Sequence, residues 1–134
     1  MARLYTLIAE MTLKLDELSE KGLRGWVEEL AALHALQVQA RALLDMVKRM
    51  ASELGYAPTT TGEAIGALLE RGVISEDEAS FLRRVAGFRN IVVHEYASVD
   101  MGLVRRIIAR REYRRVALLA ARLLEEARRL GLDP

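Results

Sequence analysis

One eight-residue segment of the chain contains four residue types that could carry chemistry, in Arg89, Asn90, His94 and Tyr96. A histidine that titrates near pH ~6.5 can act as a general base or acid at neutral pH, and an arginine can stabilise negative charge on a pentacoordinate phosphate. An amide can orient the imidazole ring or a phosphate oxygen, and a phenol can donate a hydrogen bond or accept a modification. This combination fits metal-free cleavage of RNA, in which the substrate supplies its own 2′-hydroxyl as the nucleophile.

The spacing of these residues predicts how a helix would present them. Asn90 and His94 lie at i and i+4, opposite an apolar stripe, and Arg89 and Tyr96 share one flank. The stripe consists of Phe81, Val85, Phe88 and Val92. Because Ile91 and Val93 are also apolar, the helix is hydrophobic nearly all round. We therefore expect it to be covered on both sides, with a second subunit as one cover.

Composition excludes several other classes of site. The 134 residues include no cysteine and only two histidines, His34 and His94, which excludes disulfides, thiolate zinc sites and cysteine nucleophiles. Two-metal hydrolysis needs several inward carboxylates, so we expect neither a metal nor another cofactor. The longest strictly apolar run covers residues 116–121, far short of a membrane span, and no signal-peptide core precedes Glu10. The expected compartment is the cytoplasm, with no membrane partner.

Charge is distributed unevenly along the chain although the net charge is only +1. Residues 1–80 hold 8 basic and 13 acidic side chains, whereas residues 81–134 hold 12 basic side chains, all arginine, and 6 acidic ones. Arginine suits bidentate phosphate contacts, so we expect Arg83, Arg84, Arg105 and Arg106 to bind RNA. The alternative is that these arginines only form a solvated helix face.

Helical periodicity extends over almost the whole chain, and no segment shows sustained strand alternation. The pattern predicts helices at about residues 3–19 and 24–54, and a short third helix between Thr60 and Gly72. A fourth helix opens at Ser75, and a fifth spans residues 101–130 behind a cap at Asp100. We expect a single all-α domain over residues 1–134, an up-and-down bundle of four main helices plus one short helix.

The long second helix carries a 4-3-4-3 apolar pattern that predicts the seam of the bundle. The seam runs through Trp26, Leu30, Leu33, Gln37, Ala40, Leu44, Val47, Ala51 and Leu54. Gln37 interrupts this pattern, so we expect it to be either a hydrogen-bonded buried residue or part of an interface. His34, one turn earlier, is expected to be a partly buried or surface histidine without a chemical role.

The Arg89-x4-His94-x-Tyr96 pattern resembles the motif of HepT-like toxins, a branch of the HEPN superfamily. Other segments also resemble the family in the expected order, namely residues 35–45, 70–75, 85–90 and 99–100. The resemblance spans about residues 1–125 and shows no departure at a motif position.

The resemblance implies a helical, HEPN-like homodimer that acts as a metal-independent endoribonuclease toxin of a type VII toxin–antitoxin system. Its two motifs would face each other across the dimer cleft, with Arg89, Asn90 and His94 as catalytic residues. The implied partner is an MntA-like minimal nucleotidyltransferase antitoxin that transfers AMP from ATP to Tyr96. A bulky anion beside Arg89 and His94 would then block RNA.

Two further interpretations stay open at this point. The chain could be a non-catalytic HEPN module that docks a nucleotidyltransferase and supplies part of a nucleotide pocket. It could also be a structural helical dimer in which the motif is only a hydrogen-bonding cluster. An RNA cleavage assay with purified protein separates the first of these from a ribonuclease.

Overall fold

The computed structural model describes residues 1–94 and 99–132, apart from the side chains of residues 91–94. Within these ranges the chain forms six helices and no strand, so the all-α prediction is confirmed. The helices are α1 (Ala2–Lys21), α2 (Trp26–Glu53), α3 (Thr61–Glu70), α4 (Glu76–His94), α5 (Met101–Ala109) and α6 (Arg114–Arg129).

Side-chain caps start three of the helices where the sequence predicted them. Thr60 accepts a hydrogen bond from the Glu63 amide at 3.1 Å and so caps α3. Ser75 and Glu78 form a complete capping box at α4, with bonds of 2.9 and 3.1 Å between each side chain and the other residue's amide. At α5 the Asp100 carboxylate accepts from the Gly102 amide at 2.9 Å.

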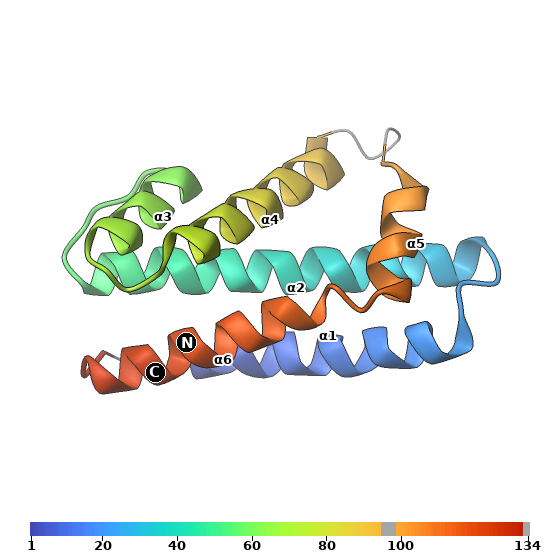
Figure 1. Cartoon of the computed structure of the whole chain (residues 1–134), viewed down its shortest axis with the longest axis horizontal. Helices are drawn as coiled ribbons and strands as arrows, with labels where there is room; N and C mark the ends of the chain where they lie inside the picture. The colour runs from blue at the N-terminus through green and yellow to red at the C-terminus, as the bar shows by residue number, and fades with distance from the viewer. Residues whose placement is uncertain (95–98, 133–134) are drawn as a thin grey trace.

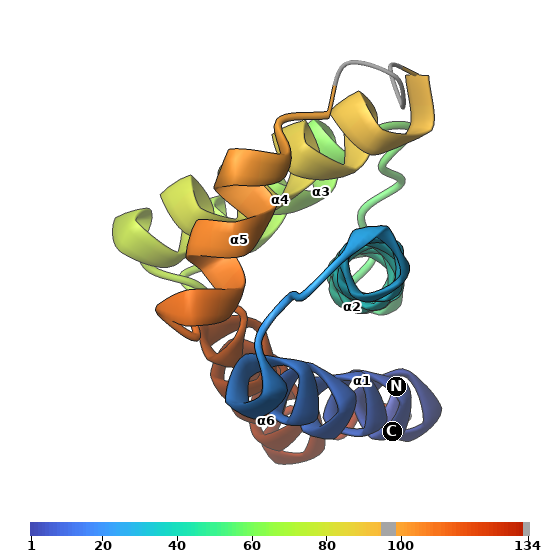
Figure 2. The same ribbon diagram turned by 90° about the vertical axis from the view of Figure 1, so that its right-hand side faces the viewer.

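Helix α2 is the centre of the bundle and packs against all five other helices (Figures 1 and 2). The predicted seam is confirmed over most of its length, because Leu33, Ala40 and Leu44 are all buried. The prediction is wrong at its start, where Trp26 is 73% and Leu30 42% exposed. Burial on α2 begins only at Ala32 and Leu33.

The buried polar residue of α2 is Gln39, 1% exposed, whereas Gln37 is half-buried. The Gln39 amide nitrogen donates to the Thr12 hydroxyl at 3.0 Å and to the backbone carbonyl of Tyr113 at 3.2 Å. These bonds connect α2 to α1 and to the segment before α6. The expectation of one satisfied polar residue in the bundle was therefore correct in kind but placed two residues early.

The predicted fifth helix is wrong as a single element, because the chain breaks at residues 110–113 and forms α5 and α6 instead. Arg111 adopts a left-handed conformation with φ 54°, which ends α5. No glycine or proline marks this break in the sequence. As Figure 1 shows, α5 then stands across the other helices, and α6 runs alongside α1.

Buried contacts of Tyr113 hold the break in place. Tyr113 is 2% exposed, and its phenol donates to the Asp16 carboxylate of α1, which also accepts from Arg114 Nε at 3.0 Å. Burial raises the pKa of Tyr113 to about 12, and the hydrogen bond to Asp16 adds to this effect. Burial alone would raise the pKa of Asp16, but the bonds from Tyr113 and Arg114 outweigh it and lower that pKa. A straight helix could not place Tyr113 on α1 and α2 while α5 packs across them.

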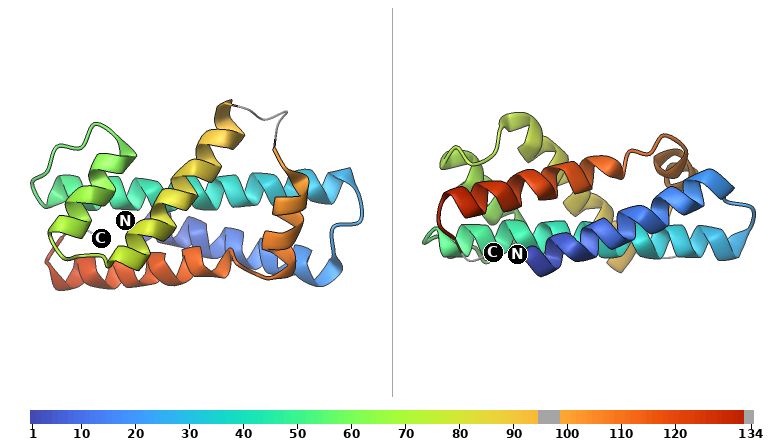
Figure 3. Two further views of the ribbon diagram at one scale, coloured as in Figure 1. Left: turned by 45° about the horizontal axis from the view of Figure 1, so that its top comes forward. Right: turned by 90° about the horizontal axis from the view of Figure 1, so that it is seen from below.

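Helix α4 begins beside α6 and moves away from it toward its own C-terminal end (Figures 1 and 3). Its close packing partners are α2 and α3. Two ion pairs connect its first turn to α6, Arg115 with Asp77 at 2.8 Å and Arg122 with Glu78 at 2.5 Å. The divergence leaves the second half of α4 standing apart from α6.

We expect Tyr113→Phe to lower the free energy of unfolding at neutral pH by about 1–2 kcal/mol, because a buried bond to a carboxylate is lost. The wild type should lose this advantage between pH 10 and about 12, since the phenol ionises first in the unfolded chain and only near 12 in the folded one. Urea denaturation followed by circular dichroism across this window measures the difference. Tyr56→Phe, outside the network, is the control, and a difference that stays constant with pH would contradict the prediction.

Arg111→Gly should raise the free energy of unfolding by about 0.5–1 kcal/mol, because glycine adopts positive φ without steric cost. Arg110→Gly is the matched control, since Arg110 has the right-handed backbone of a helix end. That variant should lose about 0.5–1 kcal/mol. Urea denaturation measures the free energy of unfolding of both variants. An Arg111→Gly protein less stable than Arg110→Gly would show that the left-handed backbone of Arg111 is not strained.

Candidate functional site

The last two turns of α4 carry the first residues of the sequence motif. Arg89 is half-buried and Asn90 exposed, and Arg89 Nη2 donates to Asn90 Oδ1 at 3.3 Å. An amide oxygen can accept from a guanidinium in this way, and the role of Asn90 in positioning stays a prediction. Helix α4 continues to His94, so the predicted i, i+4 register of Asn90 and His94 is confirmed for the backbone.

The structure describes only part of the motif. The side chain of His94 is not among the described ones, and Tyr96 lies outside the described residues. Their predicted roles stay predictions.

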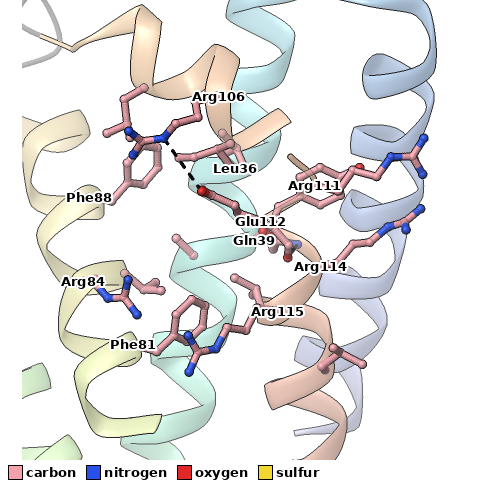
Figure 4. Close-up of a pocket in the computed structure, with 17 residues that line it drawn as sticks. Leu36, Gln39, Phe81, Arg84, Phe88, Arg106, Arg111, Glu112, Arg114 and Arg115 are labelled. Carbon is pink, nitrogen blue, oxygen red and sulfur yellow. Dashed lines mark hydrogen bonds and ion pairs between the residues drawn. The ribbon is translucent and has the colours of Figure 1, made fainter. Parts of the chain in front are cut away.

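A cavity of about 690 Å³ opens between α4 on one side and α5 and α6 on the other, with α2 as its floor (Figure 4). This volume lies within the roughly 300–1,000 Å³ typical of small-molecule sites. Phe81 and Phe88 of α4 form an apolar wall, and Leu36 and Gln39 come from α2. Phe88 directly precedes Arg89, so the cavity ends next to the motif.

Three guanidinium groups converge on this cavity, from Arg84, Arg106 and Arg115 (Figure 4). Arg115 stacks over the Phe81 ring at 4.4 Å from its centroid, and Arg84 lies 5.8 Å from the same ring. Among the lining residues the only carboxylate belongs to Glu112, whose oxygen is 4.0 Å from Arg106 Nε.

Two other arginines, Arg111 and Arg114, line the cavity only with their stems. Their guanidinium groups point toward α1, as Figure 4 shows, and Arg114 pairs there with Asp16. The charge that faces the cavity therefore comes from α4, α5 and the first turn of α6.

The structure separates the four arginines predicted to bind RNA. Arg84 and Arg106 line the cavity, whereas Arg83 is exposed and does not. Arg105 donates to the Glu29 carboxylate and to the Leu23 carbonyl, so it connects α5 to the start of α2.

Sequence reasoning missed Arg115 and the role of the Phe81 ring. The signal available was weak, because Phe81 was assigned to an ordinary apolar stripe and Arg115 was hidden inside a predicted continuous helix. His34 is exposed on α2, consistent with a surface histidine.

The three arginines of α4, Arg83, Arg84 and Arg89, pair with no carboxylate within residues 1–94 and 99–132. Several arginines of α5 and α6 are neutralised by acidic side chains of earlier helices. Arg110 and Arg128 likewise pair with no carboxylate in these ranges, so α4 carries part of the unpaired positive charge.

No group of three or more histidine, aspartate or glutamate side chains in the described part of the chain is arranged to hold a metal ion. In the same part, no helix is both long and apolar enough to cross a membrane.

An all-α bundle with an arginine-lined cavity beside an Arg–Asn pair defines a class of protein suited to phosphate-containing ligands. The sequence profile of the family described as Ribonuclease HepT-like matches residues 2–122. The chain therefore belongs to the HepT-like ribonuclease family, as the motif indicated.

Two archaeal proteins, each carrying the name "Putative RNase", are similar to this chain. The protein from Archaeoglobus fulgidus is 31% identical over 90 residues, which cover 67% of this chain and 68% of the relative. The protein from Methanocaldococcus jannaschii is 29% identical over 72 residues, which cover 54% of this chain and 83% of the relative. No solved structure matches this chain at a significant level.

Proposed function

We propose that this protein is a metal-independent endoribonuclease and the toxin of a type VII toxin–antitoxin pair. The observation that carries the proposal is the family match over residues 2–122, which includes the whole motif. The hydrogen-bonded Arg89–Asn90 pair on α4 supports it, as do the arginines of this helix that pair with no described carboxylate.

In the proposed reaction, His94 takes the proton of a ribose 2′-hydroxyl, and the oxygen attacks the adjacent phosphorus. The bond from phosphorus to the 5′ oxygen breaks, that oxygen takes a proton from water, and a 2′,3′-cyclic phosphate remains. Arg89 stabilises the charge that grows on the phosphoryl oxygens, and Asn90 holds the guanidinium in place. Arg83, Arg84, Arg105 and Arg106 contribute attraction to the RNA backbone, to an extent that falls as salt rises.

The active species in this proposal is a homodimer in which two motifs face each other. The end of α4 leads away from its own bundle, which leaves room for a second copy beside it (Figure 3). Large apolar side chains are also exposed at the start of α2, where Trp26 and Val27 are 73% and 56% exposed.

Regulation in this proposal acts through Tyr96, two residues after His94. A cognate minimal nucleotidyltransferase forms a bond between the phenol oxygen and the α-phosphorus of ATP, and pyrophosphate leaves. The AMP group adds negative charge beside Arg89 and His94 and competes with the RNA phosphate.

His94→Ala should abolish RNA cleavage while the protein stays folded, because the variant loses its proton acceptor. Cleavage of a total-RNA sample and of short synthetic RNAs by purified protein, in the presence of EDTA, measures this loss. The matched control is His34→Ala, which removes the exposed histidine of α2 and should leave cleavage within about 2-fold of the wild type. Full cleavage by His94→Ala would contradict the catalytic assignment, and no cleavage by the wild type would favour the non-catalytic docking module.

Co-expression with a cognate minimal nucleotidyltransferase should increase the intact mass of the protein by whole AMP units, mapped by peptide sequencing to Tyr96. Tyr96→Phe should remain unmodified and should cleave RNA in the presence of the partner, because it lacks the acceptor oxygen. An AMP group on another residue would contradict the regulatory assignment and leave the ribonuclease assignment intact.

A further inference from the structure

The cavity between α4, α5 and α6 lies next to the motif, and neither Arg89 nor Asn90 lines it. Its apolar walls and the guanidinium of Arg115 have no role in the reaction described above, where Arg84 and Arg106 contribute only general attraction to RNA. We propose that it binds a nucleotide of single-stranded RNA next to the one that is cleaved. This inference rests on the proposed function, since it names where the substrate of that reaction lies.

The shape and composition of the cavity favour a base with its phosphates. Its volume is about 690 Å³, and its walls include the aromatic side chains of Phe81 and Phe88. Aromatic rings and arginine planes are the surfaces on which proteins stack unpaired RNA bases. Arg115 lies over Phe81 at 4.4 Å from the ring centroid and pairs with Asp77, so both contacts favour a guanidinium at the cavity wall.

The charges around the cavity favour phosphates on two sides of that base. Arg84 belongs to α4 and Arg106 to α5, so the two cations reach the cavity from different helices (Figure 4). Arg84 has no carboxylate partner within the described residues, and the pair of Arg106 with Glu112 is long at 4.0 Å. Both side chains are exposed and can turn toward a phosphate without losing a strong ion pair.

The direction of α4 connects this cavity to the motif. Phe88 lines the cavity and Arg89, the next residue, forms the bond to Asn90. A base beside Phe88 would therefore place its neighbouring phosphate near the end of α4. At its other end α4 is joined to α6 by the pairs of Asp77 and Glu78, so the two helices are farther apart on the side of the motif.

The test measures binding of a fluorescein-labelled, single-stranded 2′-O-methyl RNA by anisotropy, since this RNA lacks the nucleophile and cannot be cleaved. Arg84→Ala and Arg106→Ala should each weaken binding roughly 5- to 20-fold, and each should reduce the slope of log affinity against log salt by about 0.7. Phe88→Leu keeps apolar bulk in the core but removes the flat ring, and it should weaken binding at least about 5-fold.

Arg128→Ala is the charge-matched control, because Arg128 is an exposed arginine at the far end of α6 and outside the cavity. Its affinity for the RNA should stay within about 2-fold of the wild type. Equal effects of Arg84→Ala and Arg128→Ala would overturn the inference. So would free AMP that displaces the RNA at equal nucleotide concentration, because the cavity would then be a mononucleotide site.

Cleavage of unmodified RNA by the same variants separates the two proposals. If His94→Ala loses cleavage but binds the 2′-O-methyl RNA like the wild type, the result supports both the ribonuclease proposal and an RNA-binding site apart from His94. Cavity variants that bind RNA like the wild type while the wild type cleaves it would contradict only the inference. A wild type that binds through the cavity but cleaves no RNA would contradict only the proposed ribonuclease.

Discussion

The contacts of Tyr113 determine where the C-terminal part of the chain turns, and the rest of the architecture depends on that turn. Its carbonyl accepts from the buried Gln39 amide, and its phenol donates to Asp16. A buried amide and a half-buried carboxylate would each be costly without these partners, so the three groups stabilise one another. Because the chain is anchored here, α5 crosses the bundle and α6 returns along α1. The cavity exists because α4 is separated from α5 and α6 in this arrangement.

Helix beginnings were predictable from the sequence because their chemistry is local. Thr60, Ser75 and Asp100 bond to amides two or three residues away, so a short window contains the whole signal. The break at Arg111 was not predictable in this way. Its left-handed backbone is stabilised through contacts of Tyr113 with residues that lie 74 and 97 positions earlier in the chain. A helical pattern with no glycine or proline predicts a continuous helix unless those distant contacts are known.

The same distinction applies to the candidate site. The Arg–Asn–His–Tyr pattern lies in one segment, so residue types and spacing identified it, and the family profile agrees. The cavity is assembled from four helices, and its stacked Arg115 and Phe81 are 34 positions apart. Arg105 shows a further limit of sequence reasoning, because its charge predicts a phosphate contact but does not reveal that its guanidinium bonds to Glu29 and Leu23. A basic residue type does not tell whether the fold has already neutralised it.

The basic side chains of the sequence fall into two groups in the structure, those in ion pairs and those without a described partner. Arginines of α5 and α6 pair with carboxylates of α1, α2 and α4, so much of the basic C-terminal part is neutralised by the acidic part that precedes it. Exposed ion pairs of this kind each add little to the free energy of unfolding, but their complementary charges favour the native pairing of the helices. Arg83, Arg84 and Arg89 of α4 meet no described carboxylate, and neither do some basic side chains elsewhere, such as Arg110 and Arg128. A phosphate-containing strand is attracted to charge that the fold leaves unpaired, and part of that charge lies on the helix that carries the motif.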